Sequence, residues 1–159
     1  MKKVIIIAAV LFVVMAVSAS AWGIGIAAGI DPLGGLPGSN LMLSVKPPSF
    51  PVLFGVGFTV WENIFNLGII ADWWVVNPNL FSFVNFYIGP GLYLGINSGA
   101  GGYSTVNLGG RIPIGLNIFP LKWLELFIEI APTLAVGFEP IQFPIFSLQG
   151  AFGIRFWFN

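Results

Sequence analysis

The 159-residue sequence contains no cysteine and no histidine, and only 8% of its residues are charged. The lack of cysteine excludes disulfides, cysteine metal sites and a lipoprotein anchor, which needs a cysteine at the cleavage point. The lack of histidine removes the commonest general base and the commonest metal ligand. In a typical soluble domain about 25% of all residues are charged. With 57% hydrophobic residues and so few charges, the composition indicates a membrane protein.

Beyond its first residues, the sequence also lacks the run of about 20 apolar residues that a membrane-spanning helix needs. Its 21 glycines and 12 prolines are scattered throughout. A closed β-barrel is the other structure that satisfies its backbone hydrogen bonds in lipid. Composition therefore predicts an all-β membrane protein.

Few groups in this sequence could support catalysis or nucleic-acid binding. After the first residues the only bases are Lys46, Arg111, Lys122 and Arg155, too few to form a basic surface for nucleic acid. No phosphate-binding loop, G-x-S-x-G motif or metal-ligand spacing occurs. We therefore expect no enzyme activity, no cofactor, no metal and no nucleic-acid partner.

Residues 1–21 have the pattern of a secretory signal peptide. Lys2 and Lys3 precede the apolar run Val4–Val17, and the small residues Ser18–Ala21 follow it. Cleavage after Ala21 fits this pattern, cleavage after Ala19 is an alternative, and an uncleaved anchor helix is the competing interpretation. The expected mature chain is a single domain, residues 22–159, exported to the periplasm.

The stretch Leu124–Val136 gives the clearest structural signal. Read with a period of two, one side is apolar and the other carries Glu125 and Glu129. A buried charge without a partner is very costly, so both carboxylates should face a closed polar interior. The competing helix would place the two glutamates four residues apart as a like-charge pair and would contain Pro132 in its interior. A barrel strand, apolar towards lipid and polar towards the lumen, fits better.

The mature chain divides into eight such alternating segments, each of about barrel-spanning length. They are Trp22–Ile30, Asn40–Lys46, Pro51–Trp61, Ile64–Trp74, Leu80–Ile96, Thr105–Ile118, Leu124–Val136 and Ile145–Phe158. Pro90 interrupts the fifth segment and suggests a bulge there. Three segments that connect strands are expected to be loops: Asp31–Gly38, Asn97–Ser104 and Gly137–Pro144. The pattern predicts an eight-stranded antiparallel up-and-down transmembrane β-barrel.

One continuous assignment of inward and outward positions brings the charged residues of the strands together in the lumen. The predicted network comprises Lys46, Asp72, Arg111, Glu125, Glu129 and Arg155. Glu125 or Glu129 is expected between the guanidinium groups of Arg111 and Arg155, because Arg pairs strongly with carboxylates at low dielectric. Inward glycines suit the narrow interior of an eight-stranded barrel. The network is interpreted as structural, with a selectivity or gating element of a small pore as the alternative.

Aromatic residues mark both the predicted membrane edge and the C-terminus. Trp22, Trp73, Trp74 and Trp123 are expected near the periplasmic rim as an aromatic girdle. The final run resembles the assembly signal of bacterial outer-membrane barrels, with Gly153 followed by the outward aromatics Phe156 and Phe158. Asn159 extends one residue past the usual terminal aromatic. The run implies recognition by the barrel-assembly machinery and by periplasmic chaperones.

Four stretches together resemble a family of small OmpX-like barrels in spirochaetes. They are Tyr87–Gly91, Gly110–Asn117, Leu124–Pro132 and Gly150–Phe158, and they cover about the C-terminal half of the chain. The resemblance implies an eight-stranded outer-membrane fold and no established activity. Arg111, Glu129 and Arg155 fall on the family's recurring charged positions.

These observations predict a non-enzymatic, monomeric outer-membrane β-barrel in contact with outer-membrane lipid. Its lumen would be mostly plugged and its role structural, or surface interaction through its loops. One alternative is a narrow conduit for a small or hydrophobic solute. Another is a soluble periplasmic lipid-binding barrel.

Overall fold

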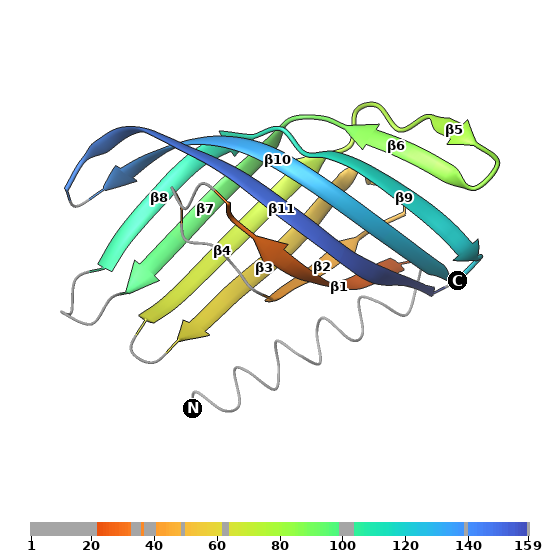
Figure 1. Ribbon diagram of the computed structural model, residues 1–159, viewed down its shortest axis with the longest axis horizontal. Coiled ribbons are helices and arrows are strands. Elements are labelled where there is room, and N and C mark those ends of the chain that lie inside the picture. The colour runs from red at the N-terminus through yellow and green to blue at the C-terminus, as the bar shows by residue number, and fades with distance from the viewer. Residues whose placement is uncertain are drawn as a thin grey trace.

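The computed structural model describes residues 22–32, 36, 41–48, 50–61, 64–98, 104–138 and 140–158. The predicted signal peptide lies outside these residues, as do parts of the three predicted loops. Eleven strands occupy the described chain (Figure 1): β1 Trp22–Ile30, β2 Leu41–Lys46, β3 Val52–Trp61, β4 Ile64–Trp73, β5 Asn79–Phe81, β6 Val84–Ile88, β7 Gly91–Ser98, β8 Ser104–Arg111, β9 Ile114–Leu121, β10 Leu124–Phe138 and β11 Gln142–Phe158. Among these residues, no helix has the length and apolar character required to cross a membrane.

Eight of the strands close into an antiparallel ring. Their order is β11–β1–β2–β3–β4–β7–β8–β10, and β10 pairs back onto β11. Following the paired residues once around the ring from Leu124 leads back to β10 at Leu134, ten residues further along. This stagger means that the strands tilt steeply against the barrel axis. The predicted all-β, eight-stranded antiparallel ring is confirmed.

Two of the eight predicted segments are not continuous strands. Residues 80–96 divide among β5, β6 and β7, with Gly89 and Pro90 between the last two. Residues 105–118 divide into β8 and β9 at Ile112 and Pro113. Proline has no N–H to donate to a ladder, so each strand stops beside its proline. The break at Pro90 was predicted from the sequence, whereas the break at Pro113 was not.

The short strands β5, β6 and β9 continue the barrel wall on the far side of these breaks from β7 and β8. β9 pairs with the first half of β10, β6 pairs with β9, and β5 pairs with β6. In Figure 1 these three strands lie together at one end of the barrel. The last strand also differs from its prediction, since β11 begins at Gln142 rather than Ile145.

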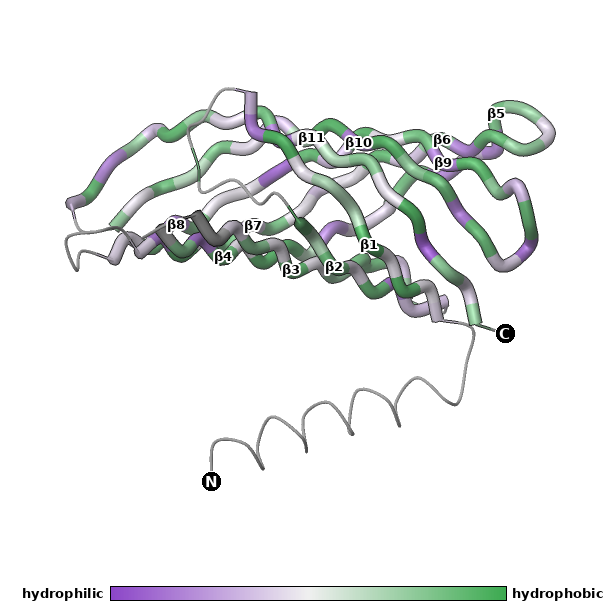
Figure 2. Tube along the Cα trace, turned by 60° about the horizontal axis from the view of Figure 1, so that its bottom comes forward, coloured by the Kyte–Doolittle hydropathy of each residue, from purple (hydrophilic) through white to green (hydrophobic). Residues whose placement is uncertain are grey.

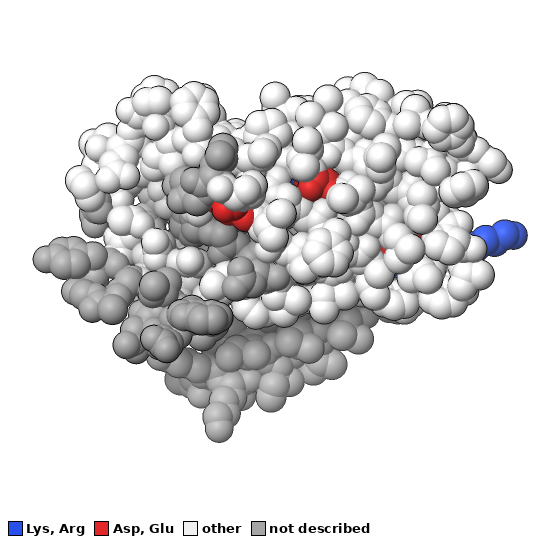
Figure 3. All heavy atoms as spheres, viewed as in Figure 1, with Lys and Arg blue, Asp and Glu red and all other residues white. Residues whose placement is uncertain are grey.

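Burial alternates along the strands in the predicted sense. On β10, Glu125, Phe127 and Glu129 are buried, whereas Ile128 and Ile130 are more than half exposed. The hydropathy of the chain changes along the strands in Figure 2, and few charged atoms are visible on the described part of the face shown in Figure 3. An apolar exterior around a polar interior is the reverse of the arrangement in a soluble protein. It fits a barrel surrounded by lipid.

Inward glycines are required by space. A Cβ at Gly153 on β11 would overlap the carbonyl oxygen of Ile26 and lie 2.6 Å from the Cβ of Ala27, on the paired strand β1. The backbone of a paired strand cannot move aside without disturbing its ladder. Gly110 on β8 differs, because a Cβ there would meet only the Gly91 carbonyl oxygen, at 3.9 Å.

Gly153→Ala should therefore destabilise the barrel by about 1–3 kcal/mol, the usual cost of overpacking a closed interior. Gly110→Ala is the matched control and should leave stability nearly unchanged. Urea unfolding of both refolded variants in detergent micelles measures the difference. Equal midpoints for the two variants would show that the β1–β11 contact is looser than the structure indicates.

Candidate functional site

All six charged residues predicted for the lumen are buried inside the barrel, and they balance in charge. Three are acids and three are bases: Asp72, Glu125 and Glu129 against Lys46, Arg111 and Arg155. They come from β2, β4, β8, β10 and β11, so the network joins strands on opposite sides of the ring. The structure sorts them into two clusters at different heights along the barrel. The lower cluster is nearer the end with Trp22 and Phe158, and the upper cluster is nearer the opposite end.

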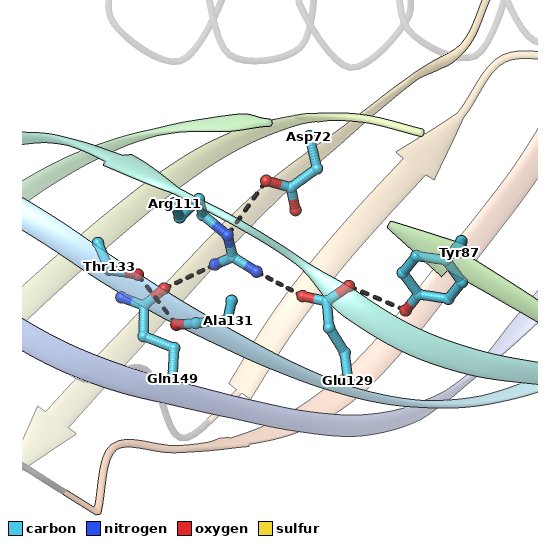
Figure 4. A network of polar contacts seen from close by, with 7 residues as sticks. All are labelled: Asp72, Tyr87, Arg111, Glu129, Ala131, Thr133 and Gln149. Atoms are coloured by element: carbon cyan, nitrogen blue, oxygen red, sulfur yellow. Dashed lines mark hydrogen bonds and ion pairs between the residues drawn. The ribbon is translucent and has the colours of Figure 1, made fainter. Parts of the chain in front are cut away.

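The upper cluster is centred on Arg111, at the end of β8 (Figure 4). Its Nε lies 3.1 Å from Oδ1 of Asp72, and one terminal nitrogen donates to Oε1 of Glu129. The other terminal nitrogen donates to Oε1 of Gln149 at 2.6 Å. Glu129 also accepts a hydrogen bond from the hydroxyl of Tyr87 at 2.8 Å. Arg111 thus lies between two carboxylates and ties β4, β8, β10 and β11 together.

Glycines on the intervening strands make two of these contacts possible. Gly91 stands in register between Asp72 and Arg111, and a Cβ there would overlap Oδ1 of Asp72. Gly115 stands in the same way between Tyr87 and Glu129, and a Cβ there would lie 2.6 Å from Cε1 of the tyrosine ring. A missing side chain on one strand lets long side chains on its two neighbours meet above it.

The lower cluster is centred on Glu125, which is fully buried. Its Oε1 accepts from Nη1 of Arg155 at 2.6 Å and from Nδ2 of Asn117 at 2.8 Å. Its Oε2 accepts from the indole nitrogen of Trp157 at 2.7 Å. Glu125 and Arg155 are direct cross-strand partners on β10 and β11. Three donors therefore satisfy this carboxylate without bulk water.

Aromatic rings connect the two clusters. The ring of Trp74 stacks on Tyr87 with centroids 4.1 Å apart, and the guanidinium of Arg155 lies 5.5 Å from the Trp74 centroid and 4.6 Å from that of Phe127. The ammonium of Lys46 lies 5.3 Å from the Trp74 ring and donates to the carbonyl oxygen of Phe50 at 2.8 Å. These cation–π contacts add attraction in a desolvated site.

Two details of the predicted site were wrong. Trp74 does not belong to a girdle at the membrane edge, because it is buried among these cations and rings. In the alternating pattern of the sequence Trp74 occupies an inward position, and that position correctly indicates burial. Neither glutamate is shared by the two arginines: Glu129 pairs with Arg111 and Glu125 with Arg155. Their four-residue separation along a tilted strand puts them at different heights, one for each arginine.

The uncharged members of the network were not predicted from the sequence. Tyr87, Asn117, Gln149 and Trp157 all occupy inward positions of the alternating pattern and each donates to, or accepts from, one of the charged groups. Inward polar or aromatic residues were thus the signal that could have identified them.

The predicted aromatic residues other than Trp74 lie on the outer side or the rim. Trp22 pairs in register with Phe158 at the end of the ring, and the ring of Trp123 stacks on Phe156 with centroids 6.0 Å apart. Trp73 projects outwards and is 52% exposed. Phe156 and Phe158 also face outwards on the last strand.

Above the upper cluster the interior leaves a cavity of about 30 Å³, lined by Asp31, Tyr93, Arg111, Glu129 and Gln149 among others. A cavity of this size has room for one or two water molecules and not for a solute. At its upper side Asp31 accepts a hydrogen bond from the Ser147 hydroxyl at 2.8 Å. Among the described residues, no three acidic, Cys or His side chains gather where they could hold a metal ion.

No protein-family model matches this chain, and no curated protein sequence matches it. Among solved structures, that of Ail, the attachment invasion locus protein of Yersinia pestis, aligns with a TM-score of 0.50, covering 87% of this chain and 97% of Ail at 13% identity. The structure of Neisserial surface protein A aligns with a TM-score of 0.49, covering 87% of this chain and 95% of that protein at 15% identity. The likeness to Ail, a small outer-membrane β-barrel protein, shows the fold. The spirochaete origin stays a prediction.

Arg111→Met tests the upper cluster. The substitution strands Asp72 and Glu129 as buried carboxylates and should lower the free energy of unfolding by about 3–5 kcal/mol. Lys122→Met is the control, since Lys122 is exposed in the turn between β9 and β10. Urea unfolding in micelles gives both values, and a loss below that of the control variant would contradict a structural role for the cluster.

Proposed function

We propose that this chain is an integral outer-membrane β-barrel protein without enzymatic activity, whose lumen is mostly plugged. One observation carries the proposal: every charged side chain of the ring strands is paired or hydrogen-bonded inside the barrel, while the outside is apolar. A soluble barrel gains nothing from that arrangement, whereas a barrel in lipid requires it.

The outer face supports membrane insertion around the whole ring. Large apolar side chains are exposed on every ring strand, for example Ile26 on β1, Phe54 on β3, Leu92 on β7 and Phe152 on β11. Each ring strand pairs with a neighbour on both sides, which is how a barrel satisfies its backbone in the hydrocarbon region. This distribution argues against the soluble lipid-binding barrel, which would need a charged exterior.

The filled interior supports a structural or surface-interaction role. Rings and ion pairs occupy the lower lumen, and the cavity above them is of water size. The loops at the end opposite Trp22 would then be the surface available to other molecules. We also propose that the barrel acts as a monomer, and that the outward Phe156 and Phe158 are read by the barrel-assembly machinery after periplasmic chaperones deliver the chain.

Charge at mid-wall should block insertion. Ile128 is 58% exposed on the outer face of β10, and Ile128→Arg should cost about 2–4 kcal/mol of folding free energy in bilayers. Ile141→Arg is the matched control, because Ile141 is 79% exposed in the turn after β10 and should tolerate the charge. Folding yield into phosphatidylcholine vesicles measures both. If both variants insert equally well, the β10 face does not contact lipid.

A second candidate function is a narrow conduit for a small or hydrophobic solute. The cavity favours it, because its floor is formed by Arg111 and Glu129, a pair whose separation would extend the cavity downwards. In this alternative the ion pair is a gate rather than a plug.

Planar-bilayer recording of refolded protein separates the two functions. A plugged barrel should give no steady conductance, and Glu129→Gln should not change this. Steady conductance of the wild type that changes in Glu129→Gln would favour the conduit over the plugged barrel. The Lys122→Met variant controls for the effect of charge outside the lumen.

A further inference from the structure

Three neighbouring ladders of the wall stop on one row of residues. The β4–β7 ladder ends at Asp72 and Gly91, the β7–β8 ladder at Gly91 and Arg111, and the β8–β10 ladder at Arg111 and Thr133. Pairing across these strands resumes at Val76 with Ile88, at Ile88 with Ile114 and at Ile114 with Ile130. Between these rows lies a band in which the three ladders are interrupted, although Trp73 still pairs with β3 and Pro132 with β11.

Prolines explain the band. Pro90, Pro113 and Pro132 lie within it on three adjacent spans of the wall. The amide of Trp73 donates to the Pro90 carbonyl at 2.8 Å and the amide of Ile112 to the Pro132 carbonyl at 3.0 Å. Neither bond can be returned, since proline has no N–H. The carbonyl of Trp73 accepts instead from Val75, two residues along its own chain. Each junction of the band is therefore held by fewer backbone hydrogen bonds than a regular ladder.

Below the band lies a panel, residues 74–90 and 112–123, which contains β5, β6 and β9. One side of the panel is joined to β10 through β9. The opposite side is β5, which among the described residues pairs with β6 alone and ends the strand order. Figure 1 shows β5 and β6 at the outer end of the sheet. The panel is thus attached along β10, along the proline band and through the amide of Trp74, which donates to the carbonyl of Pro51 at 2.9 Å. Among the described residues, β5 has no strand partner outside the panel.

Inside the barrel, Tyr87 fastens the panel on β6, the strand next to β5, while Asn117 on β9 also donates to Glu125 on β10. The Tyr87 hydroxyl donates to Glu129 on β10 at 2.8 Å, and the tyrosine ring stacks on Trp74. Behind it lie the rings of Trp74 and Phe127. An outward movement of the β5 corner would break the Tyr87–Glu129 bond and uncover this aromatic part of the lumen.

We propose that the panel is a hinged section of the wall. It bends along the band of Pro90, Pro113 and Pro132, opens at its β5 corner, and is held shut by Tyr87 on Glu129. Opening would connect the lower lumen, with its rings and ion pairs, with the surroundings of the barrel. The inference concerns motion of the wall and goes beyond the plugged, membrane-inserted barrel proposed above.

Hydrogen exchange of the refolded barrel in detergent micelles tests the hinge. Amides of β6 and β9 should exchange about tenfold faster than the paired amides of β3 and β4, because sub-global opening exposes the first set alone. Pro132→Ala restores a donor opposite Ile112 and should slow exchange in β6 and β9 about three- to tenfold, as one added hydrogen bond predicts. Tyr87→Phe keeps the ring and removes the bond to Glu129, so it should accelerate the same amides.

Pro120→Ala is the matched control, since Pro120 is exposed on β9 but lies outside the band. It should leave exchange in β6 unchanged. Should Pro132→Ala fail to fold, Pro90→Ala restores a donor opposite Trp73 and takes its place. Either of two results would overturn the hinge. One is equal amide exchange rates in β3, β4, β6 and β9, and the other is amide exchange in β6 and β9 that is no faster in Tyr87→Phe than in the wild type. Because the measurement uses micelles, its outcome is independent of bilayer insertion and conductance.

Discussion

The barrel depends on neutralising charge in a closed interior. Six buried ionisable groups, three of each sign, would be prohibitive in a narrow lumen if each stood alone. Arg111 and Arg155 solve this by donating to carboxylates from other strands, so that each ion pair also joins two strands. Packing alone would fill such an interior. Ion pairs also fix which strands face each other, because a one-residue slip would move a charge to the lipid side.

The glycines are the part of the sequence that makes these contacts possible. Gly91 and Gly115 each lie in register between two partners that touch above them, and a methyl group at either position would occupy the space of the contact. The network therefore depends on two kinds of residue: the charged residues that pair and the glycines that leave space between them. A search of the sequence for charged residues alone identifies the first kind and not the glycines.

The alternating pattern was sufficient to predict the ring, the inward set and most strand ends. Strict period-two burial leaves little freedom, and β1 matches its predicted bounds, Trp22–Ile30. Pairing inside the lumen could not be predicted in the same way. Which carboxylate meets Arg111 depends on the ten-residue stagger of the ring, a property of all eight strands together. Trp74 illustrates the same limit: its inward parity was visible in the sequence, but its contact with Lys46 and Arg155 depends on the tertiary arrangement.

The proline band and the upper cluster occupy neighbouring rows, and this proximity has a physical reason. Asp72, Gly91, Arg111 and Thr133 form the last paired row before three ladders stop. On that row Arg111 reaches β4, β10 and β11 through its side chain. On this row, side-chain bonds therefore connect the strands where the backbone ladders between them end. A wall closed by backbone ladders is rigid, whereas one closed by a few side chains can respond to whatever competes for them. The same arginine that neutralises the lumen therefore also holds the barrel together at its least regular level.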